Sequence, residues 1–353
     1  MKRLGLKIGI VIGIAIIIIL GAMNIVQFQN KMKIIQIMNN TCQQVIVIQN
    51  NSQTIDSTSC SSLIPSEGLL AKRVYAKILQ PKSYLITNFY PLQKALKSYI
   101  HERDLSVSLY VENLNGGANM GIDENEGAFP ASLNKIPVAV LVLQQIGRGR
   151  LELNQTIELN GTNENITVQA ALEKMLKESD NNAFYSLLGL INNDIGGSTD
   201  LKRLLDYYSI DINGVYETPD STKANDILLG PKVMANMFGT LYYSTVLSDK
   251  DSEYLLRLLA NTTYGMKEQA KLPENVTLSN KYGVYQTGNI QVFNNCGIIY
   301  EFDPNIRVLY CIMTRDLNEK EARAVTAEMI NSIYSYVIQT RSELDVYKKQ
   351  GYI

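Results

Sequence analysis

Histidine is nearly absent from this 353-residue chain, and tryptophan is absent altogether. The single histidine, His101, lies in the polar run 97–103, where the pattern predicts a solvated position on a helix. A Ser-His-Asp triad would have to recruit this one surface residue. A serine nucleophile in this chain therefore needs another base, and lysine is the usual substitute.

The chain also lacks an excess of charge of either sign and lacks cysteines at metal-binding spacing. Its 33 basic and 34 acidic side chains give a formal net charge of −1, so nothing in the composition supports nucleic acid as a partner. The four cysteines, Cys42, Cys60, Cys296 and Cys311, form no C-x-x-C pair, which argues against a thiolate zinc site. We expect no metal and no other cofactor.

Residues 8–26 form a long run without a charged side chain. As a helix the run would span about 28 Å, which matches the hydrocarbon core of a bilayer. Basic residues at 2, 3 and 7 favour an N-terminus inside the cell. We expect residues 1–7 to form a cytoplasmic tip and 8–26 to form a single anchor in the cell membrane, with the remainder outside the cytoplasm. A cleaved signal peptide is the alternative, although no clear A-x-A-like pair of small residues lies around residues 20–23.

The rest of the chain divides by composition. Residues 27–88 are largely rich in Asn, Gln, Ser and Thr, and are interpreted as a stalk or small extension. Residues 89–343 carry the periodic apolar patterns of a compact domain, and 344–353 are interpreted as a C-terminal tail.

Within the domain, strands are expected near both ends and helices between them. The expected strands are 105–111, 278–285, 290–300 and 307–313; the expected helices are 92–100, 131–147, 168–177, 182–191, 199–208, 231–243 and 318–341. This order predicts an α/β sandwich whose antiparallel sheet is assembled from distant segments and flanked by helices, with a helical subdomain inserted.

Ser132 and Lys135 form an S-x-x-K motif at the start of the apolar helix 131–147. The i, i+3 spacing places the hydroxyl and the amine on one helix face, close enough for proton transfer. Pro137 suits only the first turn of a helix, which fixes the helix start near Ser132, where free N–H groups favour an oxyanion. Alone, the motif is weak, because an N-cap serine and a solvated lysine would produce it too.

Two further motifs follow in order. Ser179, Asp180 and Asn181 form S-D-N between two predicted helices, and Lys281, Tyr282 and Gly283 form K-Y-G on a predicted strand. S-x-x-K, S-D-N and K-T-G are the three elements of β-lactamases and penicillin-binding proteins. Over residues 90–343 the chain therefore resembles the class A β-lactamase-like serine hydrolases, which implies a β-lactamase/transpeptidase-like fold.

The resemblance implies a role for each motif residue. Ser132 would be the nucleophile, Lys135 its base and Ser179 a proton relay. Asn181 would contact a substrate amide, and Lys281, with Tyr282 and Gly283, would hold the substrate carboxylate. The backbone N–H groups of Ser132 and Val284 would form the oxyanion hole.

The third motif departs from the family pattern, since Tyr282 stands where a threonine is usual. The phenol oxygen lies much farther from the backbone than a threonine hydroxyl does, so substrate preference is open. A second register, Gln286-Thr287-Gly288, has the threonine but no cation. Lys281 is therefore preferred.

The deacylating glutamate of the family, usually in an E-x-x-L-N setting, has no clear counterpart. Glu217 is the candidate, although no Leu-Asn pair follows it and a surface carboxylate on a turn is the alternative. The resemblance thus implies an acyl-enzyme hydrolase of β-lactams or D-alanyl-type peptides. A penicillin-binding or carboxypeptidase-like protein with poor deacylation, or a non-catalytic ligand-binding ectodomain, is the alternative.

Cys296 and Cys311 lie on two strands that are expected to pair about a turn at residues 303–304. In that register the two cysteines lie directly opposite each other, within disulfide range. A bridge is expected if the domain is exported; two separate buried thiols are the alternative.

Overall fold

The computed structural model describes residues 88–191, 203–204, 206–208, 229–287, 290–302 and 306–349. All of them belong to one compact unit, which spans residues 66–353. Within these ranges no helix combines the length and the apolar character that crossing a membrane requires. The predicted anchor 8–26, the predicted stalk apart from Asn88, and Glu217 lie outside the described residues.

A five-stranded antiparallel sheet lies at the centre of the domain. Its strands, in the order β2-β1-β7-β6-β5, are β2 (Asn119–Ile122), β1 (Ser106–Asn113), β7 (Ile306–Arg315), β6 (Ile290–Glu301) and β5 (Thr277–Thr287). Strand β1 pairs with β7, almost two hundred residues later in the chain, so the predicted assembly from distant segments is confirmed.

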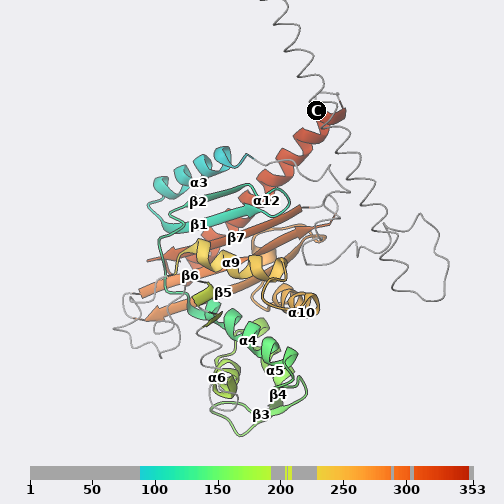
Figure 1. Ribbon diagram of the computed structural model, residues 1–353. Coiled ribbons are helices and arrows are strands. Elements are labelled where there is room, and N and C mark those ends of the chain that lie inside the picture. Colours follow the sequence, from blue (N-terminus) through green and yellow to red (C-terminus); the bar gives the residue numbers. More distant parts are fainter. Residues whose placement is uncertain are drawn as a thin grey trace, which may run out of the picture. The chain divides into compact units, whose positions relative to one another are not determined.

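Alternate residues of the strands face two separate apolar cores. On β7, Val308, Tyr310 and Ile312 belong to one core, and Leu309, Cys311 and Met313 belong to the other. Helices α3 (Tyr90–Glu102) and α12 (Glu319–Lys349) cover the first face, and α9 (Pro231–Tyr242) and α10 (Asp249–Ala260) pack on the second (Figure 1). Helix α11 (Met266–Gln269) contributes Met266 to the core on the first face. The predicted α/β sandwich is therefore confirmed.

The helical subdomain adjoins the second face. It contains η2 (Ala131–Asn134), α4 (Lys135–Gly147), α5 (Val168–Glu173), η3 (Lys174–Glu178), α6 (Asn181–Gly189) and a ribbon of β3 (Thr156–Glu158) and β4 (Asn165–Thr167) (Figure 1). Helix α4 is buried without interruption from Lys135 to Leu143, as expected for a helix that is apolar on all sides. It therefore holds its first turn rigidly.

The structure corrects several predicted boundaries. The helix expected over 131–147 begins as a 3₁₀ turn and becomes α-helical only at Lys135. The helix expected over 168–177 divides into α5 and the π-helical turn η3. Helix α12 continues to Lys349, beyond the expected end at 341, and the helix expected over 199–208 lies largely outside the described residues.

Cys296 and Cys311 form a disulfide between β6 and β7. They are direct cross-strand partners, and both are fully buried. The predicted register and the predicted bridge are confirmed. On the other side of Cys296 its partner on β5 is Lys281, so the bridge lies next to a residue of the K-Y-G motif.

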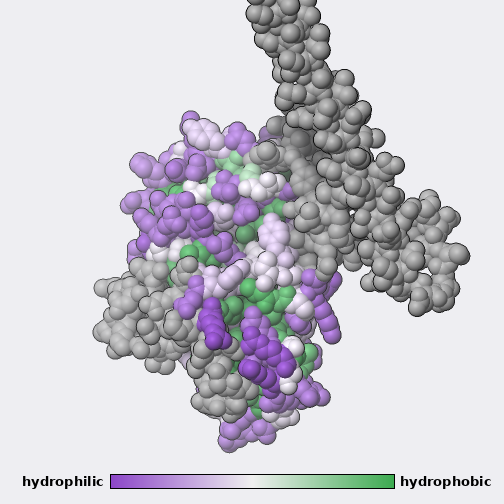
Figure 2. Space-filling model, in the orientation of Figure 1, coloured by the Kyte–Doolittle hydropathy of each residue, from purple (hydrophilic) through white to green (hydrophobic). Residues whose placement is uncertain are grey.

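Hydrophilic residues cover most of the described surface on the face shown in Figure 2, with small hydrophobic areas between them. His101 is exposed in the last turn of α3, as the sequence predicted. A histidine in this position cannot take part in a buried catalytic site.

Candidate active site

The site begins at a strained turn just before Ser132. Ala131 has φ +50°, a left-handed conformation that is unfavourable for a residue with a side chain. The turn starts η2 and leaves Ser132 half-buried ahead of the buried helix α4. Strain of this kind persists only where the surrounding structure holds it, and it is frequent at functional sites.

Lys135 lies one turn after Ser132 and points back to it. Its Nζ atom is 3.0 Å from Ser132 Oγ, 2.5 Å from Ser179 O and 2.7 Å from Asn181 Oδ1. The carbonyl oxygens of Ser179 and Asn181 can only accept hydrogen bonds, so they take two hydrogens of the amine. The hydroxyl oxygens of Ser132 and Ser179 also lie within hydrogen-bond distance of Nζ, at 3.0 and 3.2 Å.

Ser179 is presented by an unusual helix end. The π-helical turn η3 ends at Ser179, which has φ +60°, and Asp180 then caps α6 by accepting a hydrogen bond from Ala183 N at 2.7 Å. Short π-helical segments are frequent at functional sites. The turn directs Ser179 Oγ to a point 3.2 Å from Lys135 Nζ.

Lys281 reaches Ser179 from β5 on the opposite side. Its Nζ atom donates to Ser179 Oγ at 2.7 Å and to the carbonyl of Tyr282 at 2.9 Å, and its side chain is fully buried. Gln286, from the alternative register, is exposed. Ser179 Oγ therefore bridges the two lysines that the sequence selected.

Gly283 brings β5 against the turn that carries Ser132. A Cβ atom on Gly283 would lie 2.6 Å from Pro130 O and 3.1 Å from Ser132 N. Only glycine allows this approach. The backbone at Gly283, one residue before Val284, therefore lies against the segment Pro130–Ser132.

Both lysines have lowered pKa values. Burial lowers the pKa of Lys135 to about 8, although the charge of Asp180 partly opposes the shift. Burial, and secondarily the charge of Lys135, hold the pKa of Lys281 well below its ordinary value. The fold therefore raises the fraction of neutral amine next to Ser132.

Tyr282 is fixed by an aromatic stack at the edge of β5. Its ring stacks on Tyr264 at 3.8 Å between centroids, and Arg323 lies 4.0 Å over the centroid of Tyr264. Lys281 Nζ lies 4.2 Å from the centroid of the Tyr282 ring. Burial raises the pKa of Tyr282, which a hydrogen bond with Ser179 partly opposes, and the phenol also donates to Glu178 O at 3.5 Å.

Two contributors were not identified from the sequence. Asn294 on β6 is fully buried and donates from Nδ2 to Phe129 O at 2.7 Å, and Phe184 on α6 lies under Lys135 Nζ at 5.9 Å. Adjacent asparagines in the otherwise apolar strand 292–300 were the available signal for Asn294. Glu217 is outside the described residues, so its relation to this site is not described.

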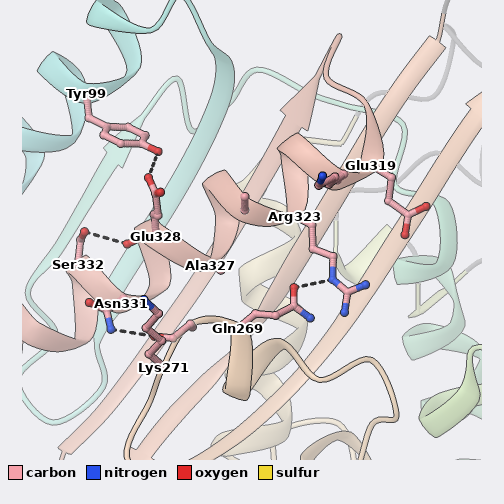
Figure 3. A pocket seen from close by; sticks show the side chains of 12 residues that line it. Tyr99, Gln269, Lys271, Glu319, Arg323, Ala327, Glu328, Asn331 and Ser332 are labelled. Carbon is pink, nitrogen blue, oxygen red and sulfur yellow. Dashed lines mark hydrogen bonds between the residues drawn. The ribbon is translucent and has the colours of Figure 1, made fainter.

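A separate hollow of about 810 Å³ lies between α11, α12 and the end of α3 (Figure 3). Among its lining residues, Arg323 donates to Gln269, and Asn331 donates to the carbonyl of Ala270. Neither Ser132 nor Lys135 lines it. This hollow is therefore distinct from the cluster around Ser132.

An α/β sandwich that brings S-x-x-K, S-D-N and a lysine-glycine strand to one point defines the penicillin-recognising class of serine hydrolases. The chain belongs to the Beta-lactamase enzyme family, whose model matches residues 91–337.

The proteins that are similar to this chain are distant from it in sequence. Beta-lactamase VEB-1 of Pseudomonas aeruginosa is 24% identical over 274 residues, which cover 67% of this chain and 86% of the relative. Extended-spectrum beta-lactamase PER-1 of the same organism is 25% identical over 244 residues, 61% of this chain and 78% of the relative. The solved structure of PBP-A has a TM-score of 0.61 at 19% identity, with 72% of this chain and 98% of that chain covered. The structural similarity shows the shared fold.

Proposed function

We propose that this protein is a serine hydrolase that forms an acyl-enzyme on Ser132 with β-lactams or D-alanyl-type peptides. The observation that carries the proposal is the contact of a buried lysine amine, with a pKa of about 8, with the hydroxyl of Ser132 at 3.0 Å. This contact supplies the base that the missing histidine chemistry would otherwise provide. Relatives named as beta-lactamases support the substrate class.

Acylation follows from the contacts of Lys135. The neutral amine accepts the proton of Ser132 Oγ, which attacks the substrate carbonyl carbon. Backbone N–H groups of Ser132 and Val284 stabilise the oxyanion, and the closeness of Gly283 to Ser132 N supports this pairing. As the C–N bond breaks, Ser179 donates a proton to the leaving nitrogen and regains one from Lys135, 3.2 Å away.

Lys281 and Tyr282 are proposed to recognise the substrate carboxylate. Lys281 is held against Ser179 Oγ, so a carboxylate beside Ser179 would meet its charge. The amide oxygen of Asn181 is engaged by Lys135, which leaves its NH₂ group to contact a substrate carbonyl.

Intact-protein mass spectrometry with benzylpenicillin tests the proposal. The expected result is a mass increase of one penicillin on the wild type and none on Ser132→Ala, with both proteins equally folded. Adduct formation by Ser132→Ala would refute the nucleophile. A wild type that never gains mass with any β-lactam or D-alanyl thioester would favour a non-catalytic ligand-binding ectodomain.

The lifetime of the adduct separates the two enzymatic alternatives. If Glu217 activates the hydrolytic water, the wild-type adduct decays and Glu217→Gln accumulates it. A long-lived adduct that is the same in both proteins identifies a penicillin-binding protein instead.

We also propose that residues 8–26 anchor the chain in the cell membrane with the catalytic domain outside the cytoplasm. The uncharged run and the basic residues before it support this proposal. The full chain should stay in the membrane fraction after alkaline extraction, and a chain without residues 1–26 should not. Release of the full chain would contradict it.

A further inference from the structure

Asn294 is a fully buried polar residue whose side chain bonds the segment just before the strained turn at Ala131. It lies on β6, where its cross-strand partners are Gly283 on β5 and Met313 on β7. Its side chain is completely inaccessible, and Nδ2 donates to Phe129 O at 2.7 Å, across 165 residues of sequence. The residue thus ties the segment before the nucleophile to the middle of the sheet.

The bond to Phe129 lies just before the strained turn, because Ala131 and Ser132 follow Phe129 and Pro130 in the chain. Ala131 is held at φ +50°, which costs about 1–2 kcal/mol for a residue with a Cβ atom. A turn with this strain relaxes unless its ends are fixed. Phe129 is fixed by its ring contact with Tyr285, 4.8 Å between centroids, and by the bond from Asn294.

The cross-strand pair of Asn294 and Gly283 also lies next to the proposed oxyanion hole. Gly283, the partner of Asn294, is the residue at which an added Cβ atom would meet Pro130 O and Ser132 N. Asn294 therefore holds Phe129 at the row of the sheet where β5 meets the turn. A shift of Phe129 would move the amide of Ser132 relative to that of Val284.

The side-chain oxygen of Asn294, Oδ1, argues against a purely stabilising role. Among the described residues, Oδ1 of Asn294 is buried and has no hydrogen-bond partner. A buried acceptor without a partner costs about 1–3 kcal/mol, comparable to or larger than the gain from one hydrogen bond. Asn294 thus adds little net stability. Its effect on the position of the turn can therefore be measured separately from its effect on the free energy of unfolding.

We infer that Asn294 is a positioning residue for acylation: it fixes Phe129 and thereby aligns the hydroxyl and amide of Ser132 with the amide of Val284. The inference rests on the proposed acyl-enzyme function. The residue touches no substrate; it acts through the turn. Misplacement of a catalytic group by about 1 Å can lower a rate on the order of 100-fold.

Asn295 provides a matched control on the same strand. It is equally buried, but its side chain bonds Asn280 Oδ1 at 3.2 Å and accepts from Tyr310 Oη at 2.6 Å. These contacts lie on the α12 face of the sheet, since Tyr310 belongs to that core. Asn295→Ala therefore removes buried hydrogen bonds of the same kind without touching the turn.

The test measures acylation of the full chain by benzylpenicillin at several concentrations, separating the rate constant at saturation from the non-covalent dissociation constant. Asn294→Ala and Asn294→Leu, which conserves volume, are compared with Asn295→Ala and the wild type. We expect both Asn294 variants to lose about 10- to 100-fold in the rate constant while the dissociation constant changes less than about twofold. Asn295→Ala should lower the thermal midpoint more than Asn294→Leu does, and keep the wild-type rate constant.

Affinity for a boronic acid, which forms a tetrahedral adduct with the serine, supplies a second measurement. It should fall in the Asn294 variants in parallel with the rate constant. Wild-type acylation rates in both Asn294 variants, or an equal loss in Asn295→Ala, would overturn the role of Asn294 alone. A wild type that forms no adduct would overturn the proposed function, and the role of Asn294 with it.

Discussion

In the proposed function Lys135 activates Ser132, in a chain whose one histidine is exposed. A lysine in water is almost fully protonated at neutral pH and cannot act as a base. Burial in the first turn of α4 lowers the pKa of Lys135 to about 8. With that value about a tenth of the amine is neutral at pH 7, against far less for a free lysine.

The acylation rate should therefore increase with pH. Because only the neutral amine accepts the proton of Ser132, we predict that the second-order rate constant for benzylpenicillin rises between pH 6.5 and 9, with a midpoint near the pKa of Lys135, about 8. Lys135→Ala should lose adduct formation at every pH. A flat profile across this range would contradict a lysine base.

Tyr282 is expected to determine selectivity for the carboxylate. Its phenol lies beside Ser179, and its ring cannot swing away because Tyr264 stacks on it. We predict that Tyr282→Phe weakens capture of benzylpenicillin about 10- to 100-fold, the value of one hydrogen bond to a charged group, and leaves the methyl ester unchanged. The measurement is the acylation constant for each compound.

Tyr264→Phe is the matched control for this prediction. It keeps the aromatic stack but removes the hydroxyl that donates to Glu319 at 2.7 Å. Selectivity in Tyr264→Phe should match the wild type. Equal losses for acid and ester in Tyr282→Phe would reject the carboxylate contact.

At the scale of elements, the site depends on how closely β5 approaches η2. We predict that Gly283→Ala abolishes most acylation, at least about 100-fold, because its Cβ atom would meet Pro130 O at 2.6 Å and separate the two oxyanion amides. Gly239→Ala in α9 is the control, since its nearest neighbour, a methyl group of Leu309, would lie 3.9 Å away.

The two glycine variants should differ in acylation: Gly283→Ala loses it and Gly239→Ala keeps it. Gly239→Ala should raise the free energy of unfolding by about 0.5–1 kcal/mol, the gain of alanine over glycine in a helix, with normal acylation. Urea unfolding and acylation rates together check both. Normal acylation by Gly283→Ala would show that the close approach is not required.

Which elements could be predicted from the sequence depends on how strongly their own residues determine them. Strands β5, β6 and β7 are long, with 11, 12 and 10 residues, and they were predicted. Strand β2 has four residues and is defined only by its pairing with β1. Helix α10 was missed although Ser248, its N-cap, accepts from Asp251 N, a capping pattern that the sequence contains.

The site residues likewise include some that the sequence predicted and some that it did not. The sequence predicted S-x-x-K, S-D-N and K-Y-G because each motif is local, and the structure brings them together. The bond from Asn294 to Phe129 and the stack of Tyr264 on Tyr282 depend on register and packing. The adjacent asparagines of β6 could mark Asn294, but no pattern within one segment could have revealed these two contacts.

For the molecule as a whole, the two buried lysines couple stability to pH. The pKa of Lys135 in the folded state, about 8, is below the unfolded value of about 10.4, so the unfolded chain binds more protons between these values. Stability must then increase with pH in this window. Tyrosines with raised pKa values, among them Tyr110 and Tyr264, act in the opposite direction as the pH approaches 10, because they ionise in the unfolded chain first.

We therefore predict that the free energy of unfolding rises by roughly 1–2 kcal/mol from pH 8 to pH 9. Lys135→Met should reduce this rise and be more stable than the wild type at pH 8, because it removes a buried charge. Urea titrations at the two pH values check this. A free energy of unfolding that falls over the window would contradict the lowered pKa of Lys135.

The central claim is that Ser132 becomes acylated, and peptide mapping of the adduct tests it most directly. Wild-type protein is mixed with benzylpenicillin, quenched in acid, digested and analysed by tandem mass spectrometry. The account predicts the penicilloyl group on Ser132, with Ser179 unmodified. An adduct on Ser179 or on any other side chain, with Ser132 unmodified, would contradict it.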